Sequence, residues 1–273
     1  MFKRLTKYFI ILGLCSGMTW AQTGKVKRAD RAIENLSYPK AERLYQAAIQ
    51  QGAGPEVAGK LAKLLTATGR PELAVPVFAA ALQGANTDTE LQLAYAKALQ
   101  SAGQYANASK WYRSYAEKGD YPDDARRSAQ ICDELLKKST QPNRYEVRAM
   151  PFNTQASEMG AIAQGGGWLL ASNQNRGFMS HPLDPTNGKS CYDLYQVMPD
   201  SKRGYQRQLL RDKVNSRFHD GPCAAPTADG MLYFTRSNFV RGKYARDEKG
   251  YNHLQVMSAQ LKGRKWKHVQ VLP

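Results

Sequence analysis

A pattern of small and aromatic residues recurs three times in the first half of this 273-residue chain. In each copy an alanine is followed four residues later by an aromatic residue. The three pairs are Ala41 and Tyr45, Ala74 and Phe78, and Ala108 and Tyr112. The alanines recur with a nearly constant period of about 34 residues. A fixed period of this length indicates stacked helix pairs, because one pair alone cannot bury its apolar face.

The period and the alanine–aromatic spacing resemble those of the tetratricopeptide repeat. This resemblance implies that the alanine lies where the two helices of a repeat cross, and that the aromatic residue fills the gap to the next repeat. Gly69 and Gly103 fall at the expected turn between helices, where a left-handed backbone suits glycine. The first repeat departs from the pattern, because Leu36 and Ser37 occupy its turn.

Apolar residues at helical spacing and prolines suited to first turns predict seven helices. We expect them over residues 29–36, 39–51, 55–68, 71–83, 87–101, 105–118 and 122–138. The last one is polar and is typical of a helix that caps such a stack.

Two lysines are candidate binding residues. Lys63 and Lys97 are separated by one repeat period, at equivalent positions on the concave face that the first helices of the pairs would form. They could bind an acidic or C-terminal peptide. The alternative is two lysines that are simply solvated.

Helical periodicity ends in a polar segment, residues 139–150, which we interpret as a linker. Beyond it, glycine turns precede short apolar runs that predict strands over residues 168–173, 193–198, 231–238 and 253–257. Gly160 and Gly221 occupy matching contexts in two successive copies of this arrangement. The second half therefore contains two β-units with a period near 60.

Several motifs of this half resemble the propeller segment of one exported protein family. They lie at residues 152–154, 157–160, 219–222 and 229–238. The family comprises OmpA-family proteins of Bacteroidetes-type bacteria, including PorE-like components of the type IX secretion system. They carry tetratricopeptide repeats, a WD40-like (PD40) propeller and later domains, one of which binds peptidoglycan. Because the chain stops at Pro273, near the end of a second blade, the resemblance implies truncation before those domains.

The expected fold class is therefore α + β and multidomain: a tetratricopeptide-like α-solenoid followed by an incomplete WD40-like β-propeller of about two blades. We place a signal peptide at residues 1–21, the repeats at 22–138, the linker at 139–150 and the partial propeller at 151–273. Blade one would cover about 151–215 and blade two about 216–273.

The N-terminus has the pattern of an export signal. Lys3, Arg4 and Lys7 precede a short apolar stretch, and cleavage after Ala21 would follow small residues at the two recognised positions. Export predicts a periplasmic protein associated with the outer membrane, with no transmembrane span in the mature chain. A single-pass anchor, or a lipoprotein modified at Cys15, is the alternative interpretation.

Three cysteines remain after such cleavage, namely Cys132, Cys191 and Cys223. In an oxidising compartment Cys191 and Cys223 could form a disulfide. The alternative is three small buried apolar residues.

No motif of a known catalytic, metal or phosphate site occurs in the sequence, so we predict no catalytic residue, metal or cofactor. His219 and Asp220, close to Cys223, come nearest to a nucleophile constellation. Adjacent residues of a strand point to opposite faces, however, which favours a turn motif instead.

The chain has 39 Lys and Arg against 23 Asp and Glu, and loss of residues 1–21 would leave a charge of +13. This charge predicts attraction to anionic cell-surface polymer, whereas export and the lack of a nucleic-acid motif argue against nucleic acid. The basic residues at 202–217 and 241–249 are expected in solvated loops.

The function that these features favour is a non-enzymatic periplasmic scaffold in an outer-membrane or type IX secretion machine. Its partners would be other envelope or secretion-system proteins. The alternative is the N-terminal part of a propeller-bearing hydrolase whose catalytic domain lies outside this chain. A third interpretation, a module that senses glycans or peptides, would need an internal pocket.

Overall fold

The computed structural model describes residues 20–83, 88–141, 145–174, 183–224 and 226–272. The chain forms a helical unit that extends to Tyr145 and a β-rich unit that comprises most of the residues from Glu146 onward. This boundary lies within segment 139–150. Most of the expected signal peptide, and with it Cys15, lies outside the described residues.

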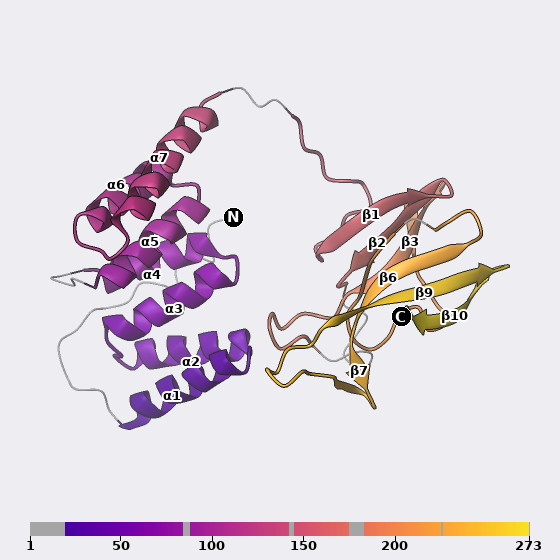
Figure 1. The fold of residues 1–273 in the computed structure, drawn as a ribbon, viewed down its shortest axis with the longest axis horizontal. Helices are drawn as coiled ribbons and strands as arrows, with labels where there is room; N and C mark the ends of the chain where they lie inside the picture. Colours follow the sequence, from indigo (N-terminus) through magenta and orange to yellow (C-terminus); the bar gives the residue numbers. More distant parts are fainter. Residues whose placement is uncertain (1–19, 84–87, 142–144, 175–182, 225, 273) are drawn as a thin grey trace. The chain divides into compact units, whose positions relative to one another are not determined.

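The described residues of the helical unit form seven consecutive helices (Figure 1). They are α1 (Trp20–Glu34), α2 (Tyr38–Gln50), α3 (Pro55–Ala67), α4 (Pro71–Ala81), α5 (Thr89–Ser101), α6 (Tyr105–Ala116) and α7 (Pro122–Ser139). Six of them match the predicted helices to within two residues. The first begins at Trp20 rather than at residue 29, so it includes the expected cleavage point. In the described part of the chain, every helix is too short or too polar to cross a membrane.

Small residues allow the helices of each pair to approach closely. Ala41, Ala74 and Ala108 are all fully buried, as the repeat pattern predicts. The turns of the second and third repeats contain Gly69 and Gly103, each with φ of 73°. The corresponding turn of the first repeat places Leu36 at φ of 54°, so the backbone keeps the left-handed geometry without glycine.

The β-rich unit contains two four-stranded antiparallel sheets, each built from consecutive hairpins. Sheet one comprises β1 (Glu158–Gln164), β2 (Gly167–Ser172), β3 (Asp193–Asp200) and β4 (Gly204–Leu209). Sheet two comprises β5 (Asp220–Cys223), β6 (Met231–Ser237), β9 (Leu254–Lys262) and β10 (Lys265–Val271). A short hairpin, β7 (Phe239–Val240) with β8 (Lys243–Tyr244), is inserted between β6 and β9.

The four predicted strands correspond to the central strands β2, β3, β6 and β9, whereas the edge strands were not predicted. One expectation was wrong. Residues 202–217 do not form only a solvated loop, because Arg207 lies on β4 and its side chain is largely buried against Glu158. The edge strands β1 and β4 consist only of exposed and half-buried residues, so their sequences are difficult to distinguish from polar loops.

The two sheets share one core. Leu169 and Ala171 of β2 belong to the same apolar cluster as Leu232 and Phe234 of β6. The opposite face of sheet one carries a second cluster, which includes Leu170, Tyr195 and Val197. Sheet one is therefore packed on both faces, with sheet two on one of them.

Candidate functional site

The helical unit contains a cavity of about 360 Å³ between α3 and α5. Its lining combines acidic and basic side chains, namely Glu56, Lys60, Lys63 and Asp88, with Gly59 and Leu91. Gly59 matters because a Cβ atom there would lie 2.7 Å from Cδ1 of Leu91. Glycine therefore allows α5 to pack tightly against α3 beside the cavity.

The two candidate lysines of the repeats have different surroundings. Lys63 lines the cavity, and its ammonium lies 3.6 Å from the carboxylate of Glu90 on α5. Lys97 is exposed on α5, is not part of the cavity lining, and makes no ion pair with another described residue. The structure therefore does not bring the two lysines into one pocket.

Further contacts neutralise charge along the same helices. Lys60 lies 3.1 Å from Asp30 of α1, and the hydroxyl of Tyr45 donates a hydrogen bond of 2.6 Å to the same carboxylate. Asp30, Lys63 and Lys97 are equivalent positions of successive repeats. The predicted concave face therefore carries both acidic and basic side chains rather than a set of basic residues alone.

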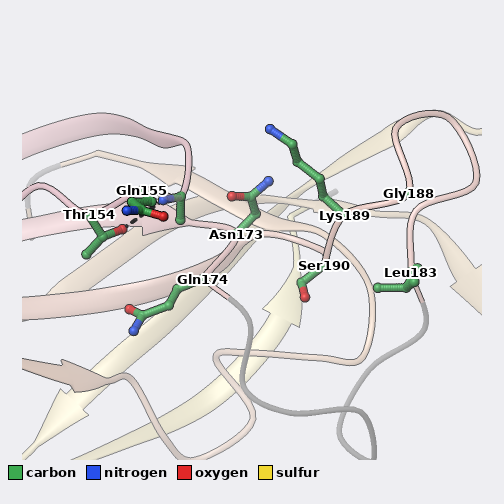
Figure 2. Close-up of a pocket in the computed structure, with 9 residues that line it drawn as sticks. Thr154, Gln155, Asn173, Gln174, Leu183, Gly188, Lys189 and Ser190 are labelled. Carbon is green, nitrogen blue, oxygen red and sulfur yellow. Dashed lines mark hydrogen bonds between the residues drawn. The ribbon is translucent and has the colours of Figure 1, made fainter. Parts of the chain in front are cut away.

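A second cavity, of about 500 Å³, lies in the β-rich unit at the ends of β1 and β2. Most of its lining side chains are amides and hydroxyls, with one ammonium group (Figure 2). The polar lining residues are Thr154, Gln155, Asn173, Gln174, Lys189 and Ser190. These side chains can donate and accept hydrogen bonds, and the described part of the lining includes no carboxylate or imidazole.

The half-buried His219 contacts residues that follow lining residues of this cavity in the sequence: Asp184 follows Leu183, and Cys191 follows Ser190. Nε2 of His219 is 3.4 Å from the carboxylate of Asp184, and Nδ1 accepts a hydrogen bond of 3.2 Å from the N–H of Tyr192. Burial would lower the pKa of His219, but hydrogen bonds and charge from Cys191 and Asp184 raise it to about 9. The carboxylate of Asp184 thus favours the protonated form of His219, whereas the N–H of Tyr192 favours an unprotonated Nδ1.

The side chains of His219 and Asp220 have different partners. Asp220 does not contact His219; it is fully buried and forms an ion pair with Arg236, which also donates hydrogen bonds to the carbonyls of Lys213 and Val214. The partner of His219 is Asp184, which lies far from it in the sequence, before β3. No local sequence motif indicates this pair, because His219 and Asp184 come together only in the folded chain.

The disulfide between Cys191 and Cys223 is not formed in the structure. Cys191 lies beside His219, with its sulfur 4.0 Å from the hydroxyl of Tyr244, whereas Cys223 is on β5 opposite Phe234. Cys132 is a third free thiol, fully buried on α7. Across the residues that the structure describes, no His, Cys, Asp and Glu cluster is arranged to hold a metal ion.

Three fully buried alanines, one on the second helix of each consecutive pair, define the architecture of the first unit. The helical unit is tetratricopeptide-like. Models of known protein families and curated protein sequences give no match to the chain.

Two solved structures are similar to the helical part. One is the Sgt2 TPR domain from Aspergillus fumigatus, with 18% identity and a TM-score of 0.40 over 51% of this chain and 97% of that one. The other is the Arabidopsis OM64 TPR domain, with 18% identity and a TM-score of 0.35 over 44% of this chain and 96% of that one.

Proposed function

We propose that this chain is a non-enzymatic protein-interaction scaffold whose helical repeats bind a segment of a partner protein. The observation that carries the proposal is the cavity between α3 and α5, which has two lysines and two acidic residues in its lining. A partner segment with both acidic and basic side chains would match this lining, exchanging the Lys63–Glu90 contact for intermolecular ones.

The same proposal places the chain in the periplasm, as part of an outer-membrane or type IX secretion machine. It rests on the signal-like N-terminus and on the motifs of the second half. Cell fractionation of a tagged full-length chain checks this placement. Recovery in the cytoplasmic fraction would contradict it, whatever the repeats bind.

The two sheets are, in this proposal, successive blades of an incomplete propeller. The shared apolar core of the two sheets supports it, because neighbouring blades of a propeller pack their sheets against one another. On the outer face of sheet two, Val256 is 50% exposed, whereas Phe234 on the inner face is buried. Val256→Lys should therefore leave the thermal midpoint of the free chain nearly unchanged, while Phe234→Ala should lower it strongly.

Cross-linking with envelope extract tests the binding role. The full chain is compared with Lys63→Glu, which alters the cavity, and with Lys118→Glu, which makes the same charge change on an exposed residue outside it. We expect one or more envelope proteins to be captured by the wild type and by Lys118→Glu, and much less by Lys63→Glu. Equal capture by all three chains would contradict a role for the cavity.

A further inference from the structure

The tip of the β9–β10 hairpin carries the densest positive charge of sheet two. Four basic residues occur within six positions, all exposed: Lys262, Arg264, Lys265 and Lys267. The segment contains no acidic residue. In contrast to Lys60 and Lys63 of the repeats, none of the four forms an ion pair with any residue that the structure describes.

The hairpin geometry holds these cations close together. Lys262 and Lys265 are directly paired across the strands, an arrangement that destabilises a sheet when the charges are alike. Trp266 alternates with Lys265 and Lys267 and packs against the shared core, so the two lysines lie on the opposite face. The anchored hairpin therefore keeps Lys262 and Lys265 on neighbouring strands, where their like charges repel.

A second contact adds to the basic surface. The N–H of Trp266 donates a hydrogen bond of 3.1 Å to the carboxylate of Asp212. This bond fixes the hairpin to a loop whose flanking residues, Arg211 and Lys213, are both exposed. The four basic residues of the hairpin and the two of the loop make six cations. The one carboxylate among them, that of Asp212, already accepts the hydrogen bond from Trp266.

Protection of the sheet edge accounts for only part of this charge. β10 is an edge strand, and lysines on an edge discourage pairing with other chains. That role fits Lys265 and Lys267. It does not fit Lys262, which lies on the inner neighbour β9, or Arg264, which lies in the turn.

We propose that the β9–β10 hairpin binds a linear acidic polysaccharide. The Cβ atoms of residues that face the same side of such a hairpin are about 5 Å apart across the strands and about 7 Å apart along them, and the long basic side chains can adjust from there to carboxylates of successive sugars. Single-stranded nucleic acid fits less well, because its binding sites add aromatic rings on which bases stack. The hairpin has one Phe, Tyr or Trp side chain, Trp266, which is half-buried against the core, and one exposed imidazole, His268. This site is separate from the repeats and goes beyond the scaffold function.

Binding of polygalacturonate to the full chain tests the proposal. The hairpin variant combines Lys262→Gln, Arg264→Gln, Lys265→Gln and Lys267→Gln. The matched control removes four exposed charges of the helical unit with Lys118→Gln, Arg127→Gln, Lys137→Gln and Lys138→Gln. Affinity is measured between about 50 and about 200 mM salt, and circular dichroism checks that each variant is folded.

We expect the hairpin variant to lose affinity by about tenfold or more, with a shallower salt dependence, and the control to change by about twofold or less. Equal losses in the two variants, or no binding by the wild type, would overturn the proposal. Tighter binding of a thymidine oligonucleotide than of polygalacturonate would overturn the choice of polysaccharide. If the hairpin variant does not fold, Arg264→Gln alone should still lose about threefold, and an unchanged affinity would refute the site.

Discussion

The two units differ in where they place their charges. In the helical unit, charged pairs lie near the surface: Arg113 and Asp133 are 2.5 Å apart, with side chains 56% and 37% exposed. In the β-rich unit, Arg236 and Asp220 form a pair whose side chains are 9% and 0% exposed. An Arg–Asp ion pair therefore affects stability differently in the two units, because water screens an exposed pair much more than a buried one.

This difference shows what holds each unit together. The repeats depend on small and aromatic residues that recur in each copy, and their ion pairs are additions to that packing. The sheets share an apolar core, but Arg236 also joins β6 to the loop before β5 through two backbone carbonyls. Loss of one buried charge in the sheets should therefore cost far more than loss of an exposed one in the repeats.

Arg236→Ala gives the largest expected effect. It leaves the carboxylate of Asp220 buried without a counter-charge, and should lower the free energy of unfolding of the β-rich unit by about 3 to 5 kcal/mol. The matched change Arg113→Ala should lower that of the helical unit by about 1 kcal/mol or less. Native-state hydrogen exchange reads each unit separately. Similar losses in both units would break the comparison.

The next largest expected effect is a pH dependence of the free energy of unfolding, and it is confined to the β-rich unit. The pKa of His219 is raised to about 9 from an ordinary value of 6.5, so its protonation stabilises the folded state. That contribution is complete below about pH 6.5 and is lost as the pH rises through about 9. It should amount to about 3 kcal/mol or less, because protonation of Nδ1 also breaks the hydrogen bond from the N–H of Tyr192. Urea unfolding at several pH values measures it, and His219→Gln should flatten the dependence over this window.

Ala108→Val probes the repeats by overpacking. The alanine is fully buried, and two additional methyl groups have no space at the contact of α6 with its neighbours. We expect a loss of about 1 to 3 kcal/mol in the helical unit, with hydrogen exchange of the sheets unchanged. Ala106→Val changes the same residue type on an exposed position of α6, and should have a much smaller effect. An equal loss in the two variants would show that burial is not the cause.

The comparison also explains which features could be predicted from the sequence. Local patterns predicted the helices, since Ala41 and Tyr45 of one repeat recur as Ala74 and Phe78 of the next. The central strands were also predicted. Pairs such as His219 with Asp184, or Arg207 with Glu158, join residues that are distant in the sequence, so no local pattern could reveal them. The repeat alignment singled out Lys63, which lines the cavity, but it gave no signal for the partner Glu90 on another helix.

Leu36→Gly should have the smallest effect on stability, and it should stabilise the helical unit where the other substitutions destabilise. Leu36 has a φ of 54° and is 41% exposed, so replacement removes backbone strain with little loss of apolar burial. Gly69 and Gly103 already occupy the equivalent turns at φ of 73°. The strain relieved, about 1 to 2 kcal/mol, exceeds the added entropy of an unfolded glycine, about 0.5 to 1 kcal/mol. The helical unit should therefore gain a few tenths to about 1 kcal/mol in thermal or urea unfolding. Gly69→Leu, the reverse change one repeat later, should destabilise it by a similar amount, and the same sign in both variants would disprove the equivalence of the turns.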